Sequence, residues 1–142
     1  MGFAGTFLAQ IPFMPTGFVY VIDSPTTFDL LAGPTEGREI CDELELAGIE
    51  HAYHLAADKE MLEIVLRLRI ATECKRRGVP PTLLFSVYAE DFGLRMTSGE
   101  LVPWAELRGM LLAVRDAHAA GTFLCVMRSK GGGLTDLFVR RW

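Results

Sequence analysis

Three short runs of mainly apolar, β-favouring residues constrain the fold of this chain more than any other feature. They span residues 18–22, 82–87 and 122–127, and turn-forming residues bound them. Such runs are typical of strands that are buried on both faces of a parallel sheet. Segments with helical spacing separate the runs, and single-helix crossovers between buried strands imply a mostly parallel sheet that is covered on both faces. The sequence therefore predicts an α/β sandwich of three layers, with a mostly parallel sheet between helices.

A first amphipathic helix is predicted over residues 39–47. Ile40 and Leu44 fall on one face of this segment, and Gly48 follows as a C-terminal cap residue. Residues 24–37 contain two prolines and two glycines, so we expect a loop before this helix.

A second, longer helix is predicted after a short strand at residues 51–55. Asp58 is a suitable N-cap, and the cationic end at Arg77 suits the negative pole of the helix. Gly78 then ends the helix. The apolar stripe is expected to comprise Met61, Ile64, Val65, Leu68 and Ala71.

A small β-hairpin is predicted around residues 97–100. Thr97-Ser98-Gly99-Glu100 is a turn sequence between two short β-favouring segments, residues 94–96 and 101–102. A last helix follows from Trp104, with an apolar stripe at helical spacing. The hairpin is therefore expected as an insertion between a core strand and a core helix.

Composition narrows the classes of partner. The formal net charge of −4 disfavours general nucleic-acid binding, which needs a basic face against the phosphates. The three cysteines form no Cys-x-x-Cys or Cys/His cluster, so we expect no metal, no disulfide framework and a cytoplasmic location. Residues 1–16 lack Lys and Arg and carry two prolines, which predicts an irregular segment without a membrane role.

A longer pattern spans residues 81–107. A buried strand ends at Ser86-Val87-Tyr88-Ala89, the hairpin follows, and Trp104-Ala105-Glu106-Leu107 opens a helix. This order of elements resembles the middle of a caspase-like cysteine peptidase domain of the bacterial type (CHAT and caspase type, clan CD). In that family the strand ends in a Ser-x-His-Gly loop that carries the catalytic base, and a Trp-x-Glu-Leu helix follows the hairpin. The resemblance covers about residues 19–130 of this chain.

The resemblance implies a catalytic dyad at two positions that are both substituted. Tyr88 stands in place of the histidine, and Ser129 stands in place of the cysteine nucleophile. A tyrosine with a pKa near 10 is no substitute for imidazole as a base, and serine is a poor nucleophile without one. We therefore expect a non-catalytic domain that acts as a regulatory or protein-interaction module, with no cofactor and a partner that the sequence does not name.

A binding crevice is expected at the carboxyl ends of the parallel strands, where sites of α/β sheets lie. Asp23 ends the first strand, Glu90 and Asp91 follow Tyr88, and Arg128 follows the last core strand. These side chains are predicted to line the crevice, where the acids could bind a basic side chain of a partner or a cation.

Two other interpretations remain open at the level of sequence. Cys125 and His54 could form a displaced dyad, which would make the domain an active cysteine peptidase. Alternatively, a flavodoxin-like module could bind a small anionic ligand at Gly131-Gly132-Gly133, where backbone amides can cradle a phosphate.

The length of 142 residues predicts a single domain over residues 1–142. Residues 128–142 differ in character from the rest and are expected to form an atypical tail. Domains of the resembling family continue for further strands, so we expect a C-terminally truncated form. Its exposed sheet edge would favour a homodimer.

Overall fold

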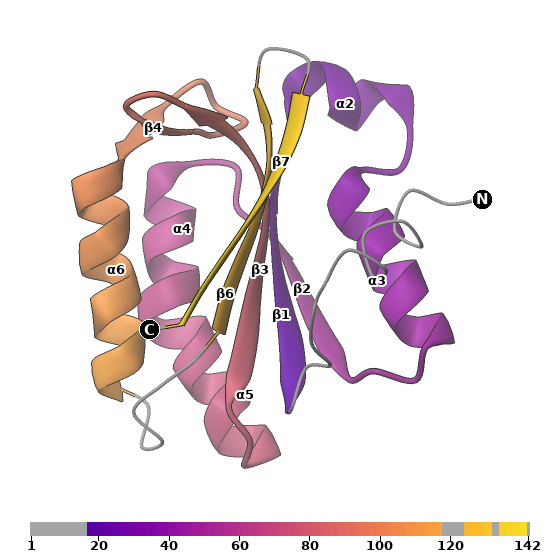
Figure 1. Cartoon of the computed structure of the whole chain (residues 1–142), viewed down its shortest axis with the longest axis vertical. Coiled ribbons are helices and arrows are strands. Elements are labelled where there is room, and N and C mark those ends of the chain that lie inside the picture. The colour runs from indigo at the N-terminus through magenta and orange to yellow at the C-terminus, as the bar shows by residue number, and fades with distance from the viewer. Residues whose placement is uncertain (1–16, 118–123, 132–133, 142) are drawn as a thin grey trace.

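The computed structural model describes residues 17–117, 124–131 and 134–141, and a single mixed sheet runs through them (Figure 1). Four strands lie parallel in the order β2-β1-β3-β6, and β7 pairs antiparallel with β6. The α/β class and the parallel centre of the sheet are thus confirmed. The bounds are β1 (Phe18–Ser24), β2 (His51–Leu55), β3 (Pro81–Glu90), β6 (Leu124–Gly131) and β7 (Leu134–Arg141).

Helices cover both faces of this sheet (Figure 1). On one face lie α2 (Thr27–Ala32) and α3 (Glu36–Leu46). The other face carries α4 (Lys59–Ile64), a π-helical turn η1 (Val65–Arg69), α5 (Ile70–Arg77) and α6 (Trp104–Ala117). The expected three layers are therefore present, because each crossover returns a helix to the sheet.

The loop predicted over residues 24–37 is wrong, since most of this segment is helical. Thr26 caps α2 by accepting a hydrogen bond at Oγ1 from the backbone N–H of Asp29 (3.1 Å), and Thr35 caps α3 in the same way with Arg38 (3.3 Å). The prolines and glycines punctuate the two helices at their ends. Helix α3 consequently starts three residues before the predicted position and ends with Gly48 in the left-handed region (φ +70°).

The helix predicted from Asp58 to Arg77 exists, and its expected apolar stripe is correct at Val65 and Met61 but wrong at two other positions. Ile64 is partly exposed and Leu68 is 63% exposed. The π-helical turn carries one extra residue per turn, so the face that contacts the sheet changes along the helix. Its buried residues are Leu62, Val65, Leu66 and Ile70.

The predicted hairpin is confirmed as β4 (Gly93–Arg95) and β5 (Leu101–Pro103). Tyr88 pairs with Arg95 of β4 on one edge of β3 and with Lys130 of β6 on the other. The hairpin therefore extends the sheet on the side of β1, beyond its last residue. Thr97 fastens it there, because its backbone N–H donates to Ser24 Oγ (3.0 Å) and its hydroxyl to the Pro25 carbonyl (2.5 Å).

Two hydrophobic clusters lie on opposite faces of the sheet. The larger one packs Phe18, Ile22 and Phe85 against α4, η1, α5 and α6. The smaller one packs Val21 and Leu84 against α3. Alternate residues of each strand serve the two clusters, which is why the strands are apolar without a period of two.

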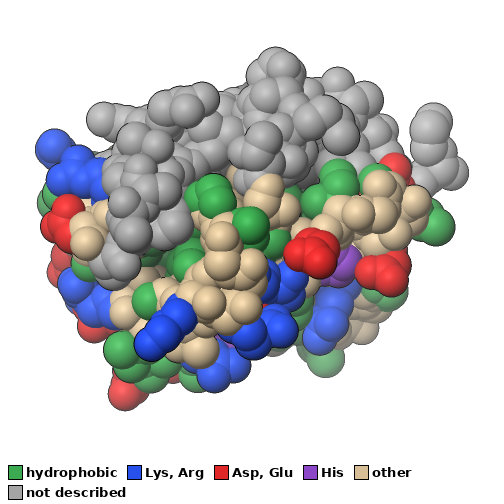
Figure 2. Space-filling view, turned by 90° about the horizontal axis from the view of Figure 1, so that it is seen from below, with side chains coloured by type: hydrophobic (Ala, Val, Ile, Leu, Met, Phe, Trp, Pro, Cys, Tyr) green, Lys and Arg blue, Asp and Glu red, His purple; other side chains and the backbone are tan. Residues whose placement is uncertain are grey.

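The amino ends of the parallel strands carry the cationic end of α5. Figure 2 views this end from below and shows Lys and Arg side chains across it. The last turn of α5 holds Lys75, Arg76 and Arg77, and the latter two form ion pairs with Glu73 (2.7 and 3.0 Å). No helix of the described residues is long and apolar enough to cross a membrane.

The tail predicted as atypical contains a regular strand. β7 pairs with β6 from Leu134 to Arg141 in unbroken antiparallel register. The predicted irregular segment, residues 1–16, lies outside the described residues.

Candidate functional site

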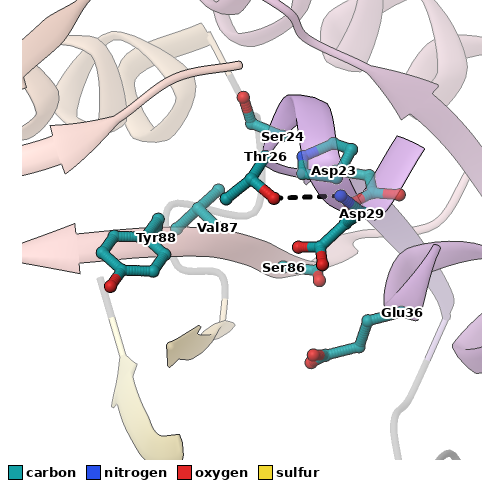
Figure 3. A pocket seen from close by; sticks show the side chains of 9 residues that line it. Asp23, Ser24, Thr26, Asp29, Glu36, Ser86, Val87 and Tyr88 are labelled. Atoms are coloured by element: carbon teal, nitrogen blue, oxygen red, sulfur yellow. Dashed lines mark hydrogen bonds between the residues drawn. The ribbon is translucent and has the colours of Figure 1, made fainter. Parts of the chain in front are cut away.

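A small open pocket lies at the carboxyl ends of β1 and β3, with the first turns of α2 and α3 around it (Figure 3). In the sheet, β2 lies next to β1 at one edge and β3 lies next to β1 at the other edge. The crossovers from β1 to β2 and from β2 to β3 therefore run in opposite directions along the sheet. Such a switch point between crossovers is where α/β sheets commonly form a binding crevice. The lining residues are Asp23, Ser24, Pro25, Thr26, Asp29, Glu36, Ser86, Val87 and Tyr88.

Asp23, a predicted crevice residue, forms the buried floor of this site. Its side chain accepts hydrogen bonds at Oδ2 from Thr35 Oγ1 (2.5 Å) and from the Tyr53 hydroxyl (2.7 Å). Asp23 lies against the first turn of α3, so closely that a Cβ built on Gly37 would sit 2.5 Å from its carboxyl carbon. The positive pole of α3 and two hydroxyl donors thus compensate its burial.

Tyr53 is held in its neutral form beside that carboxylate. Burial raises the pKa of Tyr53 above its ordinary value, and the hydrogen bond to Asp23 raises it further. The Arg38 guanidinium stacks 4.0 Å from the centre of the Tyr53 ring. Because Asp23 is occupied by these internal contacts, its main role is to join β1, β2 and α3.

Asp29 and Glu36 provide the acidic side chains of the pocket wall. They extend from α2 and α3 toward the part of β3 that carries Ser86 (Figure 3). Asp29 is only partly exposed. With Asp23 below, the described lining holds three carboxylates and no Lys or Arg side chain. Of these three, Asp29 is the carboxylate that can attract a cationic group into the pocket.

Tyr88, at the histidine position of the resemblance, lines the pocket and is half-buried. On the neighbouring strand, Ser129 is in register with Val87, and Lys130 is in register with Tyr88. The structure therefore brings the backbones of the two dyad positions onto adjacent strand ends, with an offset of one residue.

Cys125 and His54 are not brought together. Cys125 is the second residue of β6 and lies at its amino end, in register with Leu83. His54 belongs to β2, and both β1 and β3 lie between β2 and β6. Three strand spacings amount to about 14 Å, far beyond hydrogen-bond reach. The displaced dyad is therefore incompatible with the strand order.

His54 also faces the wrong side of the sheet for this pocket. It is in register with Ile22, which belongs to the cluster under α4 and α6, whereas Asp23 faces α3. Burial lowers the pKa of His54, and the positive charge of Arg69 lowers it further. His54 is thus a half-buried neutral residue outside the pocket.

Glu90 and Asp91 do not line the pocket. Glu90 pairs with Arg95 of the hairpin (2.5 and 3.2 Å), and this hydrogen bonding lowers the pKa of the Glu90 carboxyl. Asp91 lies in the exposed turn, where its carbonyl accepts a hydrogen bond from Trp104 Nε1 (2.9 Å). Both residues stabilise the hairpin and its junction with α6.

Arg128 occupies the register position next to Ser86, beside the pocket. Gly131 ends β6, and the other two glycines of the proposed anion loop lie outside the described residues. Among the described residues, no group of three or more His, Cys, Asp or Glu is arranged to hold a metal ion.

Asp29 and Glu36 are the site residues that sequence reasoning missed. Both lie in the segment 24–37 that was predicted as a loop, and a loop prediction does not say where a side chain lies relative to the sheet. Thr26-Thr27-Phe28-Asp29 matches the Ser/Thr-x-x-Asp/Glu pattern of a helix start, and this signal could have placed Asp29 on the first turn of a helix.

Comparisons of the chain with protein-family models, with curated proteins and with solved structures found no match.

Proposed function

We propose that this chain is a non-catalytic caspase-like domain that binds a protein partner by accepting a basic side chain in the strand-end pocket. The observation that carries this proposal is the position of Asp29, a partly exposed carboxylate on the pocket wall beside β3. An Arg or Lys side chain is the group in proteins that such a carboxylate pairs with most strongly.

The absence of catalysis follows from the residues at the dyad positions. Tyr88 supplies a phenol where peptidase chemistry needs an imidazole, and Ser129 lies on the adjacent strand without a histidine in register. The chain order of β3, the hairpin and α6 supports the caspase-like part of the proposal, because the resemblance was drawn from this order.

The acidic lining favours a basic ligand over the anionic ligand of the flavodoxin-like interpretation. A phosphate at this switch point would face the partly exposed Asp29 carboxylate, and like charges in a partly buried site repel.

Fluorescence anisotropy with labelled ten-residue peptides tests this function. The peptides carry a single Arg, Gln or Glu at the centre of a Gly-Ser sequence. We expect the Arg peptide to bind most tightly and the Glu peptide not to bind. Asp29→Asn should weaken Arg-peptide binding about five- to tenfold, because one charge-assisted contact is lost. Asp42→Asn on the exposed side of α3 is the matched control.

Equal affinity for the Arg and Gln peptides, or equal effects of Asp29→Asn and Asp42→Asn, would refute the basic-ligand site. Incubation with an arginyl chloromethyl ketone tests the absence of catalysis. We expect no stoichiometric labelling, whereas labelling that disappears in Cys125→Ser would establish an active peptidase.

A further inference from the structure

Helix α2 displays an apolar surface immediately beside the pocket. Phe28 is 78% exposed and Leu31 is 85% exposed, and no residue of α2 is buried. Residues at positions i and i+3 share one face of a helix, so these two side chains form a continuous surface. We call Phe28 and Leu31 the α2 ridge.

Among the residues that the structure describes, the α2 ridge has no role in packing. Apolar residues of a surface helix normally face the core, as Ile40 and Leu44 do on α3. Helix α2 instead is held at its start by the Thr26 cap, where Oγ1 accepts from Asp29 N–H and the carbonyl from Leu30 N–H (3.1 Å each). Paired large apolar side chains in water are typical of an interaction surface.

The geometry of α2 connects its ridge to the pocket. Asp29 lines the pocket, and its neighbour Phe28 projects about 100° away around the helix axis. One residue of a bound peptide segment can therefore contact the Asp29 carboxylate while a neighbouring residue of the same segment contacts the α2 ridge. Charge complementarity selects a cationic group for the first contact, and the exposed Phe28 and Leu31 select an apolar group for the second.

We infer that the partner segment carries a bulky apolar residue close to the basic residue, and that the α2 ridge binds this apolar side chain. This inference rests on the proposed function, because the basic residue in the pocket sets the position of the segment. In an extended peptide, residues two apart point to the same side with a spacing of about 6.6 Å. The partner is thus an extended segment of the type Arg/Lys-x-Leu/Phe.

A double comparison of peptides and variants tests the ridge. The labelled peptides carry Arg-Ser-Leu, Arg-Ser-Ser or Gln-Ser-Leu at the centre of the same Gly-Ser sequence. We expect Arg-Ser-Leu to bind about tenfold more tightly than Arg-Ser-Ser. The double variant Phe28→Ser/Leu31→Ser should remove this advantage and leave Arg-Ser-Ser binding unchanged. Leu46→Ser, at an 84% exposed position on α3, is the matched control and should change neither affinity.

The outcomes separate the two proposals. Arg-dependent binding that is sensitive to Asp29→Asn but indifferent to the leucine overturns the ridge and keeps the pocket. Failure of all three peptides to bind overturns both. A dimer in sedimentation velocity that dissociates in the double variant would show that a second copy covers the ridge, and this also overturns the inference.

Discussion

The two faces of the sheet differ in how completely helices cover them. On one face, α4, η1, α5 and α6 enclose a large apolar cluster that includes Leu66 and Phe85. On the other face α3 contributes the buried helical residues, and α2 contributes none. The buried charge of Asp23 and the pocket both lie on this thinner side.

The difference separates two tasks in one small domain. The thickly covered face supplies most of the apolar burial and hence most of the hydrophobic stabilisation. The thinner face can therefore carry polar contacts and an exposed helix with only a modest loss of stability. A binding site is then expected where packing is least complete, at the rim between α2 and the ends of β1 and β3.

Leu83 and Leu84 offer the sharpest test, because they are adjacent on β3 and face opposite sides. Each Leu→Ala change should cost about 2–5 kcal/mol of unfolding free energy, with Leu83→Ala in the upper part of that range. The cluster around Leu83 is larger than the cluster around Leu84, so it is less able to collapse into the cavity that the change to Ala leaves. Urea denaturation of both variants measures this, and a larger loss for Leu84→Ala would reverse the ranking of the two faces.

Gly37 and Gly109 form a second matched pair, each within a helix. Gly37→Ala should destabilise the protein by about 1–3 kcal/mol, because the new methyl group would collide with the buried Asp23 carboxyl. Apart from its own helical turn, no atom of the described residues lies within 4 Å of the Cβ position of Gly109. Gly109→Ala should therefore stabilise it by about 0.5–1 kcal/mol through helix propensity. Thermal melting of the two variants should show shifts of opposite sign.

Tyr53→Phe tests the polar contacts of the thinner face. Loss of the hydrogen bond to Asp23 should cost about 1–2 kcal/mol at pH 8. The folded pKa of Tyr53 is raised by burial, so its stabilising contribution is complete below the ordinary value of 10.0 and is lost as the pH rises further. Urea midpoints at pH 8 and pH 10.5 should converge between wild type and variant. A constant gap would mean that Tyr53 titrates normally.

Leu31→Ser should have the smallest effect on stability, within about 0.5 kcal/mol, because this side chain is 85% exposed. Equilibrium urea denaturation provides the value. A loss above about 1 kcal/mol would mean that the Leu31 side chain packs on the domain and that helices cover the two faces more evenly.

The order of strands and helices was predictable from the sequence because each buried strand is a compact apolar run. Residues 18–22 and 82–87 both became central strands. The signals failed where two effects compete. Between Pro25 and Gly37, residues that break helices also begin and end them, and the capping role of Thr26 decided the outcome.

The site was predicted less completely. The end of β1 and Tyr88 were identified, because parallel strands place their carboxyl ends at one edge of the sheet. Glu90 was wrongly placed in the pocket. Its partner Arg95 lies on β4, and the sequence does not specify how β4 pairs with β3. Asp29 was missed because its helix was.

The π-helical turn at Val65–Arg69 has a consequence for changes in chain length. In a regular α-helix, Arg69 would follow Leu62 and Leu66 on the side of the sheet, whereas here Ile70 takes that position. Removing one residue at exposed Arg67 or Leu68 would shorten the turn to a regular helix and keep Ile70 inward. This position is therefore the point in the helical layer where a single-codon deletion is best tolerated.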